Sequence, residues 1–84
     1  MSEIIIKKPS KCTFSYNKLL GKIKEIYGTQ EEFAMALGIG RVSLSQRLNN
    51  KLDFSQSEVY RSCGLLGIPI DKISMYFFQC NKDN

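Results

Sequence analysis

Residues 29–51 read TQEEFAMALGIGRVSLSQRLNNK, and this stretch decides the fold. It begins with Thr29 and has Glu32 three residues later, a capping box whose hydroxyl and carboxylate can each satisfy a free backbone N–H. Apolar residues then recur at helical spacing as far as Gly38, which has no Cβ and tolerates the positive φ of a sharp turn. A second helical pattern, with Leu44 on its apolar side, follows shortly after. The stretch therefore predicts two short helices joined by a glycine turn, which is a helix-turn-helix.

The sequence on both sides predicts further helices. Residues 15–27 place apolar side chains at helical spacing, and Gly28 ends this first helix in the usual C-terminal manner. After the quoted stretch, Ser55 and Glu58 form a second capping box, and apolar residues repeat at helical intervals from there to Gly67. These patterns predict helices before and after the helix-turn-helix in one all-α domain.

The C-terminal part of the sequence predicts an extended link and a last helix. Pro69 keeps the residue before it out of the α region, and Asp71 can cap the short helix that follows. This helix carries three adjacent aromatic residues, Tyr76, Phe77 and Phe78. One or two of them can close the core, but adjacent residues cannot all face one side of a helix. At least one is expected to protrude, so we predict a homodimer interface at these three residues.

The patterns predict one domain of five helices over residues 14–79. Residues 1–13 are interpreted as an N-terminal arm that is flexible or forms a short strand, because the isoleucines at 4–6 favour a strand. Residues 80–84 are predicted to fray. A chain of 84 residues, 43% of them hydrophobic, has the composition of an ordinary globular protein with room for one core.

The charge distribution favours a polyanion as partner. The formal net charge is +4, which attracts polyanions without identifying one. Within residues 40–52 the chain carries Arg41, Arg47 and Lys51 and no acidic residue. The simpler interpretation, the polar face of an ordinary surface helix, remains open.

The composition excludes most kinds of catalytic and metal site. The sequence contains no histidine, no paired acids in a recognisable frame and no glycine loop that could cradle a phosphate. Its three cysteines, Cys12, Cys63 and Cys80, form no CxxC pair and have no base to activate them. We therefore predict no enzyme activity, no metal and no cofactor, and we place Cys63 in the core. No apolar run is long enough to span a bilayer, which predicts a soluble protein with no membrane partner.

Residues 29–51 resemble the helix-turn-helix of Cro and lambda-repressor type proteins. The resemblance rests on these residues: Gln30, Ala34, Gly38, Ile39, Leu44, Leu48 and Asn49. The flanking helices fit the same family, so the match covers about two-thirds of the chain. It implies a five-helix, lambda-repressor-like DNA-binding domain, and a small regulator encoded by a temperate phage or prophage. Such a protein would act in the cytoplasm of the bacterial host, at the nucleoid.

The resemblance also implies which residues contact bases. Arg41, Val42 and Ser43 match family positions that face base edges. Arg41 can bind guanine bidentately, Val42 can pack on a thymine methyl, and Ser43 can bond either kind of base. Gln46 lies one turn further along the helix and can reach another base or a phosphate.

A second group of residues is implied to contact phosphates. Gln30 matches a position that contacts a phosphate and braces the recognition helix, at a helix N-terminus where anions bind readily. Asn49, Asn50 and Lys51 match the loop that contacts the DNA backbone after this helix. Asn50 replaces a frequent glycine, and asparagine tolerates the left-handed conformation better than most residues. Arg47 replaces a frequent apolar residue, so that face is either more exposed here or adds a phosphate contact.

The function that the resemblance implies is transcriptional repression by occlusion. A homodimer would bind a double-stranded DNA operator that overlaps a promoter, with its recognition helices on half-sites about 34 Å apart. The alternative is that the helix-turn-helix scaffold serves protein interaction, for example as an antirepressor or an antitoxin-like partner. Neither function requires a small-molecule substrate.

Overall fold

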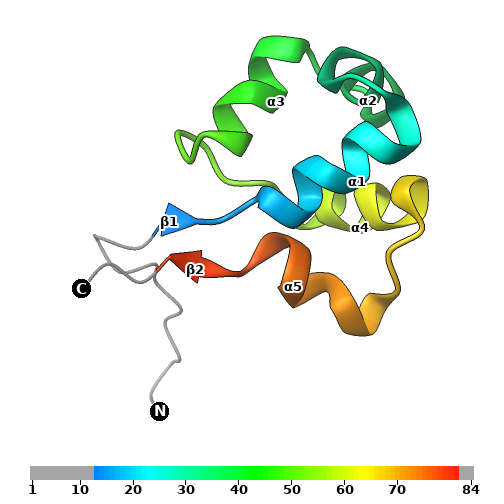
Figure 1. Ribbon diagram of the computed structural model, residues 1–84. Coiled ribbons are helices and arrows are strands. Elements are labelled where there is room, and N and C mark those ends of the chain that lie inside the picture. The colour runs from blue at the N-terminus through cyan, green and yellow to red at the C-terminus, as the bar shows by residue number, and fades with distance from the viewer. Residues whose placement is uncertain (1–12, 82–84) are drawn as a thin grey trace.

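The computed structural model describes residues 13–81, so all of the arm expected at residues 1–13 except Thr13 lies outside them. The elements follow in the order β1 (Thr13–Phe14), α1 (Asn17–Tyr27), α2 (Gln30–Leu37), α3 (Arg41–Leu48), α4 (Gln56–Leu66), the 3-10 helix η1 (Ile70–Lys72), α5 (Ile73–Phe77) and β2 (Cys80–Asn81). In Figure 1, α2 and α3 lie at the top, α1 and α4 lie below them, and α5 lies at the bottom. The five α-helices of the described chain confirm the predicted fold class.

The caps predicted from the sequence set the limits of the helix-turn-helix. The Thr29 hydroxyl accepts a hydrogen bond from the Glu32 N–H at 3.1 Å, so the hydroxyl half of the expected box caps α2. Gly38 ends α2 with a φ of 89°, in the left-handed region that the turn requires. At the start of α4, Ser55 and Glu58 form both halves of the predicted capping box.

All five α-helices contribute to one core. Its largest fully buried hydrophobic side chains are Leu19, Ile23, Phe33, Leu37, Leu44 and Phe77. Cys63 of α4 joins them, as predicted, and burial raises the pKa of its thiol. Leu44 is the buried residue of α3, so this helix is anchored by one apolar side chain and leaves the rest of its surface at least partly exposed.

The two ends of the described chain meet in a small antiparallel sheet, at the left of Figure 1. Thr13 pairs with Asn81, and Phe14 pairs with Cys80. The fraying expected from residue 80 onward therefore does not apply to Cys80 and Asn81, because β1 gives their backbone hydrogen-bonding partners.

The segment before α5 also differs from its prediction. Pro69 has the expected extended conformation, with a ψ of 148°. Asp71 does not cap α5, because it lies inside η1, which runs directly into α5. None of the helices between residues 13 and 81 is long and apolar enough to cross a membrane.

Candidate functional site

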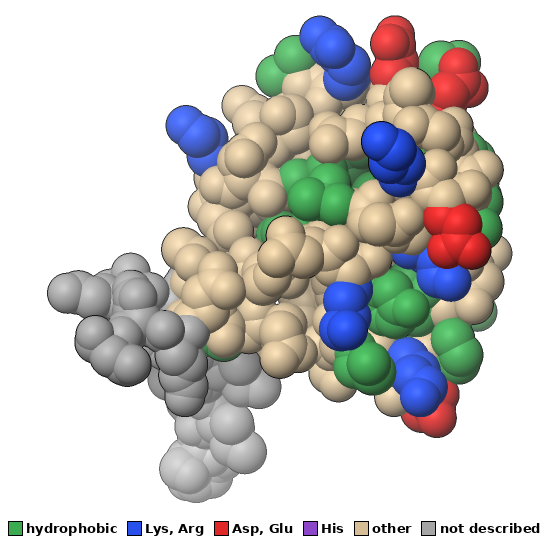
Figure 2. Space-filling view, viewed as in Figure 1, with side chains coloured by type: hydrophobic (Ala, Val, Ile, Leu, Met, Phe, Trp, Pro, Cys, Tyr) green, Lys and Arg blue, Asp and Glu red, His purple; other side chains and the backbone are tan. Residues whose placement is uncertain are grey.

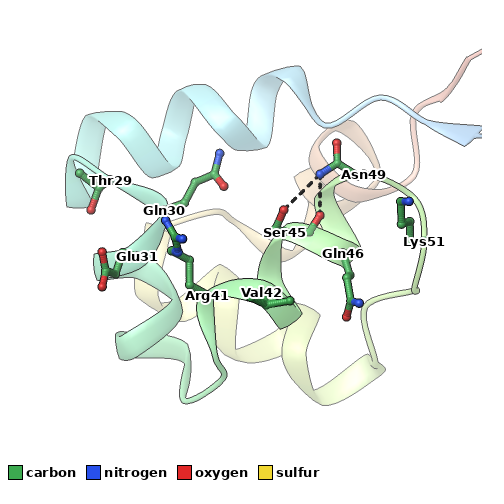
Figure 3. A pocket seen from close by; sticks show the side chains of 9 residues that line it. All are labelled: Thr29, Gln30, Glu31, Arg41, Val42, Ser45, Gln46, Asn49 and Lys51. Carbon is green, nitrogen blue, oxygen red and sulfur yellow. Dashed lines mark hydrogen bonds between the residues drawn. The ribbon is translucent and has the colours of Figure 1, made fainter.

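The two helices of the helix-turn-helix border an open hollow with a volume of about 790 Å³. Its lining, drawn in Figure 3, consists of Thr29, Gln30, Glu31, Arg41, Val42, Ser45, Gln46, Asn49 and Lys51. We call this surface the α2–α3 hollow. Most of its residues are predicted DNA contacts, so the fold brings much of the predicted site together.

The outer side of α3 presents its side chains to this hollow. Arg41, Val42 and Gln46 are exposed, and Val42 is 67% exposed although it is apolar. In Figure 3, Arg41 lies towards α2, Lys51 lies at the opposite end of the hollow, and Val42 lies between them. Among residues 13–81, neither Arg41 nor Lys51 has an ion-pair partner. The hollow thus presents two basic side chains that are not in ion pairs within the described chain, with the apolar Val42 between them.

Three residues that line the hollow were not among the contacts predicted from the sequence. Thr29 and Glu31 flank Gln30 at the start of α2, and Ser45 lies one turn beyond Arg41 on α3. Helical spacing from Arg41 could have found Ser45, whereas Thr29 and Glu31 are sequence neighbours of Gln30 and not one turn from it. Glu31 matters most, because it brings a negative charge to the Arg41 side of the hollow (Figure 3).

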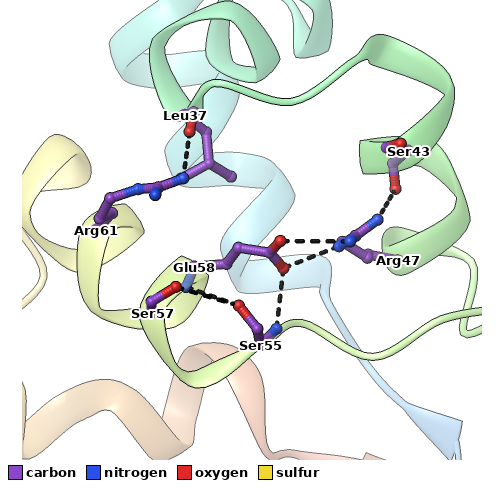
Figure 4. A network of polar contacts seen from close by, with 7 residues as sticks. All are labelled: Leu37, Ser43, Arg47, Ser55, Ser57, Glu58 and Arg61. Carbon is purple, nitrogen blue, oxygen red and sulfur yellow. Dashed lines mark hydrogen bonds and ion pairs between the residues drawn. The ribbon is translucent and has the colours of Figure 1, made fainter.

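Arg47 faces away from the hollow and is held by α4 (Figure 4). Its guanidinium donates to the two carboxylate oxygens of Glu58 at 2.9 and 3.3 Å, and to the Ser43 carbonyl at 2.8 Å. The side chains of this ion pair are only 17% and 13% exposed. Arg47 is therefore largely covered and its guanidinium already has a carboxylate partner, while the phosphate contact considered for it stays a prediction. Ser43, a predicted base contact, is half-buried and does not line the hollow.

Glu58 connects this ion pair to the start of α4. Its carboxylate also accepts a hydrogen bond from the backbone N–H of Ser55 at 2.9 Å. Burial alone would raise the pKa of Glu58, but the hydrogen bonds from Arg47 and Ser55 outweigh it and hold the pKa below its ordinary value. Glu58 is therefore charged near neutral pH, and it fastens α3 to α4.

A second residue of α4 fastens α2 and was not predicted. Arg61 donates a hydrogen bond to the carbonyl of Leu37, the last residue of α2 (Figure 4). A cation is favourable at this end of a helix because the free carbonyls carry partial negative charge. The signal in the sequence was the three-residue spacing of Glu58 and Arg61, which puts both on one face of α4. One helix thus fixes both helices of the helix-turn-helix.

The two asparagines after α3 use their amides within the protein. The Asn49 amide donates to the carbonyl and the hydroxyl of Ser45, at 2.8 and 3.2 Å. Asn50 has a φ of 63°, consistent with the glycine that it replaces. Its amide accepts from the N–H of Phe14 and donates to the carbonyl of Phe14, both at 2.9 Å. The Asn50 side chain is thus bound to β1, and the phosphate contact implied for it stays a prediction.

The three C-terminal aromatic residues have different environments. Phe77 is 1% exposed and packs edge-on against Phe54, with ring centroids 5.3 Å apart. Tyr76 is half-buried, and Phe78 is 54% exposed. Phe77 is therefore a core residue and cannot be the dimer contact that the sequence predicted. Phe78 remains available for such a contact.

Phe78 belongs to a second hollow, which lies between α4 and the η1–α5 segment. Its volume is about 830 Å³, and it is lined by Phe54, Gln56, Ser57, Val59, Tyr60, Ile70, Ile73 and Phe78. This α4–α5 hollow has no charged side chain in its lining, in contrast to the α2–α3 hollow.

Charged residues of both signs are spread over the face drawn in Figure 2. On the face drawn in Figure 2, Lys and Arg side chains are separated by acidic and uncharged ones and form no continuous basic band. Surfaces that bind nucleic acid usually gather Lys and Arg on one face or along one helix. The basic character of the α2–α3 hollow is modest, because its charged lining residues are Arg41, Lys51 and the acidic Glu31.

One solved structure gives a close likeness. It is the solution structure of the modulator of repression (MOR) of the temperate bacteriophage TP901-1 from Lactococcus lactis. The two sequences are 37% identical, the TM-score is 0.70, and the match covers 77% of this chain and 88% of that chain. This likeness supports the helical fold, but it does not single out a repressor of the Cro type.

The sequence also matches a family model. No curated protein is significantly similar to the chain. The family model described as "Protein of unknown function (DUF739)" matches residues 12–80. Because this match spans most of the chain, the protein belongs to the DUF739 family.

Proposed function

We propose that this protein is a phage or prophage regulator that modulates repression by binding a repressor protein. The observation that carries the proposal is the likeness to a phage modulator of repression, at 37% identity over 88% of that chain. Of the two functions considered from the sequence, this is the protein-interaction alternative. It places the protein in the cytoplasm of the bacterial host, and it involves no catalysis and no cofactor.

The contacts of α3 support protein binding over DNA binding. The Lys and Arg residues that neutralise phosphates supply most of a protein's sequence-independent affinity for DNA. In this fold Arg47 is paired with Glu58, and the Asn50 amide is bound to Phe14. The α2–α3 hollow then offers two basic residues, Arg41 and Lys51. So few cations would give a single copy of the chain little affinity for a duplex.

Exposed apolar residues on the helix-turn-helix point in the same direction. Met35 of α2 is 68% exposed and Val42 of α3 is 67% exposed. The buried centres of protein–protein interfaces are enriched in methionine and depleted of charged residues. A partner protein docked on α3 would bury Val42, and one docked on the exposed side of α2 would bury Met35.

A second candidate is the sequence-specific repressor that occludes an operator. The observation in its favour is that Arg41, Val42 and Gln46 lie together on the outer side of α3, where a recognition helix would present them. A two-fold dimer would double the number of phosphate contacts, and Phe78 in the α4–α5 hollow is an exposed residue suited to its interface.

Calorimetric titration of the purified protein separates the two candidates. The titrants are the purified repressor of the phage or prophage that encodes this chain, and random duplex DNA at two salt concentrations. The proposal predicts a saturable complex with the repressor and only weak binding to the duplex. Tight duplex binding that falls steeply with salt, without a repressor complex, would favour operator binding instead.

An operator assay connects the complex to regulation. The fraction of operator DNA bound by the repressor is measured with and without this protein, at a fixed repressor concentration. The proposal predicts that the bound fraction changes in the presence of the protein. An unchanged fraction at concentrations that saturate the complex would contradict a role in modulating repression.

A further inference from the structure

We infer that the α2–α3 hollow is the surface that binds the repressor, and that it accepts a carboxylate and a neighbouring apolar side chain of that partner. The inference rests on the proposed function and adds to it a contact surface and the chemistry of the partner's contacting segment.

The first argument is the charge of the hollow. Arg41 and Lys51 occupy its two ends, and within the described chain neither has an ion-pair partner. Hydrogen bonds from Arg or Lys to a carboxylate are shorter and stronger than those between neutral groups. An acidic side chain of a partner that enters the hollow would reach a cation whose charge no described residue has neutralised.

The second argument is the exposed apolar side chain between the cations. Val42 is 67% exposed, and Gln46 lies beside it on α3. A partner segment that spanned the hollow from Arg41 to Lys51 would cross Val42. An apolar side chain next to the partner's carboxylate would therefore be buried against Val42, while the Gln46 amide can bond polar groups of the partner's backbone.

Glu31 makes a protein carboxylate a better occupant than a DNA backbone. It lines the same end of the hollow as Arg41 (Figure 3). Any anion on Arg41 is repelled by Glu31, but duplex DNA, with one charge for about every 1.7 Å of its axis, would bring several phosphates close to Glu31 where a protein segment brings one carboxylate. A protein can present one carboxylate to Arg41 and keep the surrounding segment neutral.

The third argument is that α3, which forms one side of the hollow, is held firmly to the rest of the domain. Leu44 is fully buried beneath α3, and the Arg47–Glu58 ion pair holds the same helix to α4. A surface that is fixed before binding loses less conformational entropy when the partner docks. The free side chains of α3 therefore lie on a rigid support, as a specific contact surface requires.

The test uses a charge reversal in the full-length protein. Arg41→Glu should weaken binding to the purified repressor at least tenfold. The matched control is Lys72→Glu, which makes the same change in net charge at an exposed position of η1 outside the hollow, and it should leave the affinity within about twofold. Equal thermal midpoints of the two variants would establish that both remain folded.

A complementary substitution identifies the partner's carboxylate. Acidic residues on the repressor surface are changed to arginine one at a time, and each variant is titrated with Arg41→Glu. One of them should restore most of the lost affinity, because the reversed pair attracts again. Restoration by none of the acidic positions would overturn the carboxylate assignment.

The remaining outcomes separate the inference from the proposed function. If the unmodified protein binds the repressor and Arg41→Glu binds it equally well, the hollow is not the contact surface, but the proposed function stands. If the unmodified protein does not bind the repressor, both fail. If Arg41→Glu loses affinity for duplex DNA and keeps its affinity for the repressor, the hollow is a nucleic-acid surface and the inference is overturned.

Discussion

The two sides of α3 are built from similar residue types but have opposite roles. On the inner side, Leu44 is fully buried and Arg47 is bound to Glu58. On the outer side, Arg41 and Val42 are exposed and line an open hollow. An arginine on this helix can therefore either form an ion pair that holds α3 to α4 or remain available to a binding partner. Which of the two it does depends on whether α4 places an acidic side chain near it.

The largest expected effect comes from removing the inner anchor of α3. Leu44→Ala should lower the free energy of unfolding by about 2 to 5 kcal/mol, because it leaves a cavity under the helix. Urea denaturation measures the change. Leu52→Ala is the control, since Leu52 is 46% exposed and its truncation should cost much less. Equal losses in the two variants would mean that Leu44 does not anchor the helix.

Breaking the Arg47–Glu58 ion pair should have the next largest effect on stability. Arg47→Leu leaves the Glu58 carboxylate without its counter-charge, which should cost about 1 to 3 kcal/mol in the free energy of unfolding. Adding Glu58→Gln should restore part of this loss, because a neutral amide needs no counter-charge and can still serve the capping box. If the double variant is no more stable than Arg47→Leu, the loss does not come from the unpaired charge.

The same ion pair predicts a dependence of stability on pH. The pKa of Glu58 is lower in the folded protein than its ordinary value, so its stabilising effect is complete above the ordinary glutamate pKa. The effect is lost as the pH falls through the lowered pKa. The difference in free energy of unfolding between the natural protein and Glu58→Gln should therefore shrink as the pH is lowered from neutral into the acidic range. A constant difference over this range would argue against the ion pair.

The smallest effect on stability is expected on the outer side. Val42→Ser should change the free energy of unfolding by less than about 0.5 kcal/mol, because the side chain is 67% exposed. The same substitution should weaken repressor binding, measured by calorimetry. A large loss of stability would place Val42 in the packing of the domain rather than in its contact surface.

The fold could be predicted from the sequence because its signals are local. The caps at Thr29 and Ser55 and the glycine turn at Gly38 each involve a few neighbouring residues. Much of the α2–α3 hollow could be predicted for the same reason, since Gln30 and Arg41 are each the first residue of a helix.

The contacts that the sequence did not reveal share a different physical cause. Arg47 is bound by a residue 11 positions away, and Asn50 by one 36 positions away. Phe77 is buried against Phe54 of another segment. Helical periodicity indicates which way a side chain points, but it does not indicate which distant element will meet it. These three assignments therefore required the packed structure.

The contact between Asn50 and Phe14 has a consequence for the order of folding. It closes a loop of 36 residues, and the bond between Asn81 and Thr13 spans 68. Contacts between residues so far apart in the chain cost more loop-closure entropy than the local contacts of a helix, and they are expected to form after the helices. The small sheet would then be the last part to assemble and the first to open. Hydrogen exchange should reveal this as weaker protection of the Phe14 amide than of the amides in α1 and α4.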